Sequence, residues 1–200
     1  MKAKTSALDT AMQASELEFS GGSWAEPTAQ RILEAQLVHA ASPAETLMAH
    51  LQLARQYRLQ HHLAKSKQHL AKAKLALDQM QPSAAQLAAW HLESGTLAMA
   101  TESFTKARRD LQLAYKFAPQ NEAVRCELYD FESCEGSFSA AAKLSQSFED
   151  SSNYRALNLT AWKFLGIEND ELAEQYFQKA IEQARTKYGE DHAYMGHALL

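Results

Sequence analysis

Glycine, proline and β-branched aliphatic residues are all scarce in this chain of 200 residues. Only seven glycines and four prolines are present, so we expect few tight turns. Valine and isoleucine, which favour strands, are far outnumbered by alanine, leucine and glutamine, which favour helices. These scarcities argue against a β-rich fold and predict an all-α protein.

Long hydrophobic runs are also absent. No apolar run approaches the roughly 20 residues that a membrane-spanning helix requires, so we expect no membrane insertion. Residues 1–25 contain two lysines but no apolar segment typical of a secretory signal, and their Ser/Thr/Ala-rich composition predicts a disordered N-terminal arm. We expect a cytoplasmic protein; a periplasmic one would require that a signal had been removed from the sequence.

Cysteine is limited to Cys126 and Cys134. Eight residues apart on one helix, they would lie about 12 Å apart, beyond the roughly 7 Å that a disulfide allows between Cα atoms. We therefore expect two free thiols. The chain has no glycine-rich phosphate loop, no G-x-S-x-G motif and no H-E-x-x-H motif, so we expect no enzyme and no cofactor.

Two further groups of polar residues have the composition of a binding site but not its spacing. His61 and His62 are adjacent, and neighbours on a helix point in different directions, so we expect solvated turn residues and no metal site. One predicted helix carries four lysines: Lys65, Lys67, Lys72 and Lys74. They lie on both sides of the helix face that is expected to point inward and do not form one continuous basic surface, which argues against nucleic-acid binding.

The formal net charge of −4 hides an asymmetry along the chain. Residues 47–87 hold six Lys/Arg against one acidic residue, a net charge of +5, whereas residues 122–153 hold two Lys/Arg against seven acidic residues, a net charge of −5. Such an asymmetry bears on partners rather than on fold.

Two similar segments, SFTKARRDLQLA from Ser103 and SFSAAAKLSQSF from Ser137, start 34 residues apart. The same frame fits four windows, at residues 47–80, 88–121, 122–155 and 154–187. Small residues recur where two helices would meet, and large apolar residues recur between neighbouring helix pairs. We expect Phe104 and Phe138 to be equivalent packing residues of successive repeats. Tyr129 departs from the pattern, because it is large where a small residue is expected.

This pattern resembles the tetratricopeptide repeat (TPR) family over about 140 of the 200 residues. The resemblance implies an all-α, right-handed superhelix (α-solenoid) of about four helix-turn-helix repeats. A capping helix is expected at residues 26–41, the repeat array at 47–187 and a C-terminal cap at 188–200. The alternative is an irregular helical bundle whose spacing is coincidental. Members of the family are mostly non-enzymatic scaffolds that bind a protein or peptide partner, and the resemblance implies that role here.

The first helix of each repeat usually lines the concave face in this family. The resemblance therefore implies a peptide-binding groove with a basic end, an apolar middle and an indole at the other end, suited to an extended peptide or a helix. Alternatively, some of these side chains pack against the capping helices. The groove residues implied by the repeat frame are Arg55, Arg58, Leu92, Thr96, Met99, Asp130, Asn158 and Trp162.

A narrower likeness involves the segments HLQLARQYRLQHHLAKSKQHLAKA and APQNEAVRCELYDFESCEGSFSAA. They are similar to pilotin-type TPR proteins of type IV pilus biogenesis, in which a Tyr and a Cys recur at the spacing of Tyr129 and Cys134. This likeness implies, as an alternative, an assembly factor for a type IV pilus or secretion machinery. Those proteins usually carry a lipidated cysteine near their start, whereas the first cysteine here is Cys126. Nothing in the sequence points to a particular oligomeric state.

Overall fold

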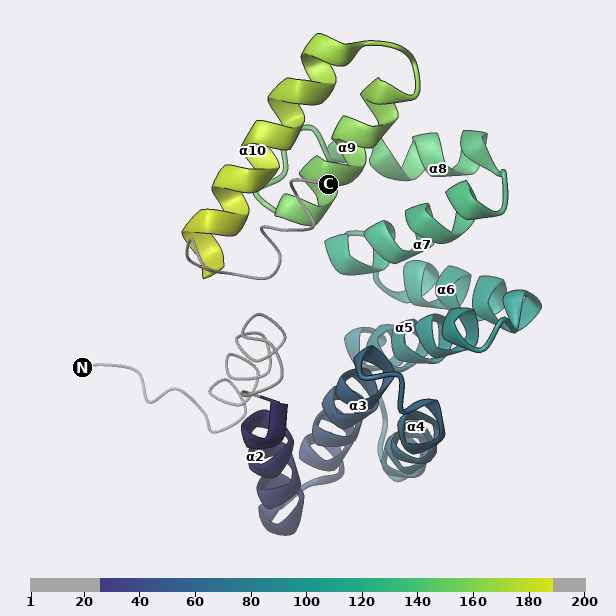
Figure 1. Cartoon of the computed structure of the whole chain (residues 1–200). Helices are drawn as coiled ribbons and strands as arrows, with labels where there is room; N and C mark the ends of the chain where they lie inside the picture. Colours follow the sequence, from purple (N-terminus) through teal and green to yellow (C-terminus); the bar gives the residue numbers. More distant parts are fainter. Residues whose placement is uncertain (1–25, 189–200) are drawn as a thin grey trace. The chain divides into compact units, whose positions relative to one another are not determined.

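The computed structural model describes residues 26–188, and every regular element in this range is helical (Figure 1). The all-α prediction is confirmed for these residues. The predicted disordered arm and all but the first residue of the predicted C-terminal cap lie outside them. The chain divides into two compact units, residues 1–119 and 120–200, and each unit is described by itself.

Five helices form the described part of the first unit: α2 (Glu26–His39), α3 (Pro43–Leu59), α4 (Leu63–Asp78), α5 (Ala84–Ala100) and α6 (Phe104–Phe117). The second unit contains α7 (Glu122–Cys134), α8 (Phe138–Leu144), the 3-10 helix η1 (Ser145–Ser147), α9 (Tyr154–Leu165) and α10 (Asp170–Tyr188). Consecutive helices pack in pairs, α3 with α4, α5 with α6, α7 with α8 and α9 with α10. This helix–turn–helix organisation agrees with the 34-residue period.

The first helix of each pair begins at a polar cap. Ser83 and Gln86 form a complete capping box, in which each side chain accepts a hydrogen bond from the backbone N–H of the other residue. The side chain of Ser42 accepts from the N–H of Glu45, and Pro43 occupies the first helical position. Asn121 and Asn153 accept in the same way at α7 and α9. These caps satisfy backbone donors that have no partner within the helix.

The four pairs share one type of interhelix turn. In each turn one residue has a positive φ: His61 at 58°, Glu102 at 55°, Gly136 at 76° and Glu168 at 59°. Its N–H donates to the carbonyl three residues earlier, and the next N–H donates to a carbonyl five residues earlier, for example His62 N to Tyr57 O at 2.7 Å. These two backbone hydrogen bonds together form a Schellman motif. The motif reverses the chain tightly and sets the two helices antiparallel.

In the first unit the paired helices approach closely at small residues. A Cβ atom added to Gly95 would lie only 2.7 Å from Cγ of Leu111, so α5 and α6 touch where the repeat frame requires a small residue. The hydroxyl of Ser66 on α4 donates to the carbonyl of Ala54 on α3 at 2.8 Å. Ala107 is fully buried on α6. α2 packs beside α3 through Leu33, which is also fully buried.

The two pairs of the second unit differ. α9 and α10 run side by side in opposite directions (Figure 1), and small buried residues line their contact: Ala161, Ala173, Ala180 and Ala184. In the other pair, Tyr129 occupies the position that Gly95 has in α5, and Phe148 occupies the position that Ala114 has in α6. Their rings meet edge to face at 6.0 Å between centroids. α8 has only seven residues and gives way to η1.

The expected packing role of Phe104 and Phe138 is wrong. Their side chains are 49% and 72% exposed, respectively. Both residues are indeed equivalent, since each is the first residue of the second helix after the same turn. At that position the Cα–Cβ bond points back beyond the start of the helix, so the ring leaves the helix contact instead of entering it.

Substituting Ala107 with Leu is expected to lower the free energy of unfolding by about 1–3 kcal/mol, because three extra carbon atoms overpack a fully buried helix contact. Ala71→Leu is the matched control, since Ala71 is exposed on α4, and a change within about 0.5 kcal/mol is expected there. Urea denaturation measures both. Equal stability of the two variants would contradict the packing of α5 against α6.

Gly136→Ala is expected to destabilise the protein by about 1 kcal/mol, and Glu102→Gly is expected to stabilise it by up to about 1 kcal/mol. Both residues hold the left-handed conformation of the shared turn, which L side chains disfavour. No atom lies within 4 Å of a Cβ atom added to Gly136, so the expected loss comes from the backbone and not from a clash. Opposite signs of the two changes in thermal or urea unfolding are the diagnostic result.

Candidate functional site

The second unit contains a pocket of about 870 Å³ formed by α7, α8, α9 and the turn after α9. Three residues of the groove implied by the sequence line it: Asp130, Asn158 and Trp162. The other lining residues are Tyr129, Ser133, Cys134, Phe138, Ala141, Ala142, Arg155, Leu159, Lys163, Gly166 and Ile167. The pocket therefore combines aromatic and aliphatic walls with a small number of polar groups, as ligand pockets generally do.

The pocket lies where the repeat pattern is broken. Tyr129 holds the place at which the other pairs have Ala54, Gly95 or Ala161. A phenol ring at this place prevents the close helix approach that a small residue permits. α8 has only seven residues, and Ala141 and Ala142 present only small side chains to the space. The departure of Tyr129 from the repeat pattern thus coincides with a cavity in the structure.

Three large apolar side chains around the pocket are open to solvent. Phe138 is 72% exposed, Ile167 64% and Trp162 49%. The indole of Trp162 rests edge to face on Phe177, with ring centroids 5.5 Å apart, so it is held in place while one side stays accessible. Apolar groups gathered in this way on a protein surface mark interaction sites.

The polar side of the pocket is organised by Arg155. Its Nη1 donates to Oε1 of Glu127 at 2.6 Å, and its Nη2 donates to Oδ2 of Asp130 at 2.5 Å. Burial raises the pKa of Asp130 above its usual value, and the Arg155 guanidinium offsets this only in part. Burial would lower the pKa of Arg155, but the two carboxylates raise it above its ordinary value. The charges of this corner are therefore held in one arrangement.

Lys163 and Asn158 complete the polar lining. Nζ of Lys163 donates to Oε1 of Glu149 at 3.0 Å, so this cation is also paired within the unit. Oδ1 of Asn158 is buried and has no hydrogen-bond partner among residues 26–188. A buried acceptor without a donor costs free energy, and a ligand N–H entering the pocket can satisfy it.

The first unit holds the other five groove residues. Arg55 is exposed, and Leu92 and Met99 are half-buried. Nη2 of Arg58 forms an ion pair with Oε2 of Glu93 at 3.4 Å, which ties α3 to α5. Thr96 is 4% exposed, and its hydroxyl donates to the carbonyl of Glu93, so it presents little surface to a partner.

None of these five residues lines the pocket of about 420 Å³ that α4, α5 and the start of α6 form in the first unit. The structure therefore brings together the members of the implied groove in the second unit, whereas those of the first unit lie outside the pocket described there.

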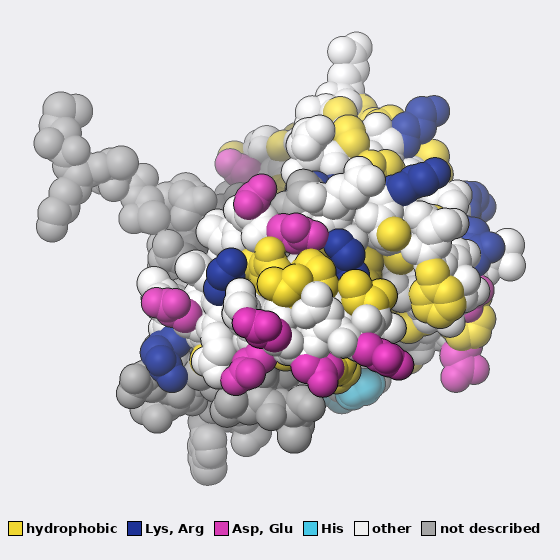
Figure 2. Space-filling view, turned by 90° about the horizontal axis from the view of Figure 1, so that it is seen from above, with side chains coloured by type: hydrophobic (Ala, Val, Ile, Leu, Met, Phe, Trp, Pro, Cys, Tyr) yellow, Lys and Arg dark blue, Asp and Glu magenta, His cyan; other side chains and the backbone are white. Residues whose placement is uncertain are grey.

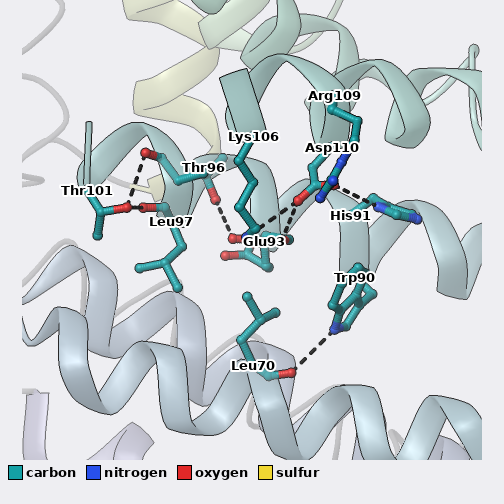
Figure 3. A network of polar contacts seen from close by, with 12 residues as sticks. Leu70, Trp90, His91, Glu93, Thr96, Leu97, Thr101, Lys106, Arg109 and Asp110 are labelled. Atoms are coloured by element: carbon teal, nitrogen blue, oxygen red, sulfur yellow. Dashed lines mark hydrogen bonds and ion pairs between the residues drawn. The ribbon is translucent and has the colours of Figure 1, made fainter. Parts of the chain in front are cut away.

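A buried polar network links α5 to α6 (Figure 3). Asp110 is 1% exposed and accepts from the Ser94 hydroxyl at 2.6 Å, and Lys106 and Arg109 lie beside it. Burial would raise the pKa of Asp110, but the hydrogen bond from Ser94 and the two cations lower it below its usual value. His91 also lies beside Asp110, so Ser, His and Asp occur together here, as in a catalytic triad. The Ser94 hydroxyl, however, donates to Asp110 and is buried. The network fastens two helices and is no nucleophilic site.

A second buried polar group joins α3 to α4. The Nδ1 atoms of His50 and His69 lie 3.1 Å apart, and Tyr57 stacks on His69 at 5.3 Å between ring centroids. Burial, with further contributions from His69 and Lys72, lowers the pKa of His50 to about 4. Burial also lowers the pKa of His69. The sequence gives no sign of this pair, because 19 residues separate its members and only the packing of α3 on α4 brings them together.

The described residues offer neither a metal site nor a membrane-spanning helix. Within residues 26–188, no three or more His, Cys, Asp or Glu side chains are grouped so that they could hold a metal ion. In the same range no helix combines the length and the apolar character of a membrane span. His61 and His62 lie exposed in the α3–α4 turn, as expected. Cys126 and Cys134 are free thiols, as expected, and burial raises the pKa of Cys126 to about 12.

Acidification is expected to weaken the first unit through His50. The pKa of His50 is lowered on folding, from 6.5 to about 4, so the unfolded chain binds the proton first as the pH falls. Stability is therefore lost between pH 6.5 and 4, by an amount on the order of 3 kcal/mol. Urea denaturation over this pH range is expected to show a shallower pH dependence for His50→Gln than for the wild type. Identical slopes would contradict a role of His50.

Comparison with known proteins gives a likeness of fold only. No protein-family model matches the sequence, and no curated protein matches it. Among solved structures, the chain is similar to MamA in its crystal structure, with 17% sequence identity and a TM-score of 0.48, over 82% of this chain and 91% of that chain. The resemblance to the tetratricopeptide repeat and pilotin-type families therefore stays a prediction from the sequence, and nothing about function follows from the structural likeness.

Proposed function

We propose that this protein is a non-catalytic scaffold that binds a peptide or helix of a partner protein, and that the pocket of the second unit is its binding site. The observation that carries the proposal is the accessible group of Phe138, Trp162 and Ile167 around a cavity of about 870 Å³. A groove that receives the apolar face of a helix or alternate side chains of an extended segment has this character.

The aromatic side chains are expected to supply most of the affinity. An indole buries a large area while only two torsions lose freedom. Trp162 is already positioned by Phe177, so little further ordering is needed when a partner binds. The ion pairs of Arg155 surround the apolar centre with fixed polar groups, which is the usual anatomy of a protein interface.

An enzymatic role has weaker support in this pocket. Cys134 is its one thiol, and no histidine occurs among the described residues that line the pocket. Activation of a cysteine nucleophile generally needs such a base or a cationic neighbour. Arg155 and Lys163, the two cations present, are each engaged by carboxylates.

Two narrower ideas from the sequence concern the same function. A pilus- or secretion-assembly factor would use the same surface, since Tyr129 and Cys134 line the pocket, but no observation favours it over the general role. An acidic partner segment at Arg55 and Arg58 stays a prediction for the first unit, where Arg58 is already paired with Glu93.

Trp162→Ala is expected to weaken partner binding by about 2 kcal/mol, a roughly thirtyfold change in Kd, because a half-exposed indole anchor is lost. Phe138→Ala is expected to weaken binding as well. Phe104→Ala is the matched control, since this exposed phenylalanine follows the same type of turn outside the pocket. The measurement is calorimetry with a partner retained by the wild-type protein, with circular dichroism of each variant.

The control also defines the contrary result. If the partner binds both pocket variants as it binds the wild type, the pocket is not the site of interaction. If Phe104→Ala weakens binding as much as Phe138→Ala, exposure of an aromatic ring, and not its place in the pocket, decides the affinity.

A further inference from the structure

We propose that the segment accepted by this pocket is basic: a short amphipathic helix that presents one large apolar side chain flanked by Lys or Arg. This inference rests on the proposed function and specifies the chemistry of the partner. It is carried by the charge around the pocket, all of which belongs to the second unit.

The cations of the pocket are already neutralised from within. Arg155 binds Glu127 and Asp130, and Lys163 binds Glu149. Both cations of the pocket are therefore already paired with carboxylates of the same unit. A partner carboxylate would have to displace one of these carboxylates from its cation, whereas a partner Lys or Arg displaces none.

The segment that follows the last lining residue, Ile167, adds more negative charge to the second unit. Ile167 is followed by a stretch, residues 168–174, that holds four acidic residues and no Lys or Arg. All four side chains are exposed: Glu168, Asp170, Glu171 and Glu174. Lys143 is the exposed cation of α8. Seen from above, hydrophobic side chains lie among acidic ones, with Lys and Arg side chains also beside them (Figure 2).

The second unit as a whole has the same bias. Residues 120–188 contain seven Lys/Arg and twelve Asp/Glu, a net charge of −5. A field of one sign attracts an oppositely charged partner and raises its association rate. The local and the unit-wide charge therefore favour the same partner.

The unpaired Oδ1 of Asn158 also calls for a donor rather than an acceptor. Lysine and arginine side chains are donors only, and carboxylates are acceptors only. A basic segment can thus satisfy both the negative charge of the second unit and the buried amide oxygen, while its apolar side chain contacts Trp162 and Phe138.

The test uses three synthetic 16-residue helical peptides with the same Trp- and Leu-containing apolar face and with Lys, Gln or Glu at the flanking positions. Fluorescence anisotropy with the full-length protein is measured at low salt, about 50 mM, and at high salt, about 500 mM. The Lys peptide is expected to bind about tenfold more tightly than the Gln peptide at low salt, and the Glu peptide is expected to bind most weakly. The difference is expected to shrink at high salt.

Two charge reversals locate the effect. Glu168→Lys is expected to weaken binding of the Lys peptide three- to tenfold at low salt, because Glu168 adjoins Ile167 at the pocket. Glu182→Lys changes the net charge equally, but Glu182 lies on α10 about 18 Å beyond its first residue, so a change below about twofold is expected. Trp162→Ala is expected to abolish the preference together with the binding.

Each other outcome overturns the inference. Equal or tighter binding of the Gln or Glu peptide shows that the partner is not basic, yet leaves the pocket as the proposed site if Trp162→Ala still removes binding. Binding unchanged by Trp162→Ala places the peptide elsewhere, and binding of none of the peptides rejects the stated chemistry. A dimer of the protein that dissociates when the Lys peptide is added, as measured by analytical ultracentrifugation, assigns the pocket to a second copy of this chain.

Discussion

Close approach of two antiparallel helices at a small residue is the constraint on which three of the four helix pairs of this protein depend. Gly95 shows it most directly, since a single added carbon atom would overlap Leu111. Ala54 and Ala161 hold the same place in α3 and α9 and are almost fully buried. Where the helices touch in this way, their remaining apolar side chains interdigitate and the second helix can be long, as α4, α6 and α10 are.

The third pair fails to meet this constraint, and the candidate site follows from the failure. Tyr129 and Phe148 stand where small residues stand elsewhere, and their rings pack on each other. The second helix of this pair is reduced to the seven residues of α8. Surface that a longer, closer helix would bury is left open, and Phe138, Trp162 and Ile167 remain accessible beside it. The pocket beside the third pair, which departs from the repeat pattern, is therefore the most promising binding surface of the second unit.

Polar groups in the interior serve different ends in the two units. In the first unit, Asp110 is surrounded by donors and cations and fastens α5 to α6, and the His50–His69 pair joins α3 to α4. In the second unit, the guanidinium of Arg155 donates to Glu127 and Asp130 at the wall of a cavity, and the side-chain oxygen of Asn158 has no partner among the described residues. The groups of the first unit hold neighbouring helices together, whereas the unpaired oxygen of Asn158 lies beside a pocket and can accept a hydrogen bond from a ligand.

The sequence by itself determined the all-α class, the helix pairs, their caps and the small residues of the helix contacts, because propensity, capping and period act over one or a few turns. It also singled out Tyr129 as an exception. It could not decide that Phe104 and Phe138 are exposed, that His50 meets His69, or that Asp130, Asn158 and Trp162 surround one cavity with Arg155 between them. These properties depend on the angle and separation of packed helices, which arise from contacts between residues far apart in the chain. Tertiary structure alone therefore decided which of the apolar residues became core and which became a surface for binding.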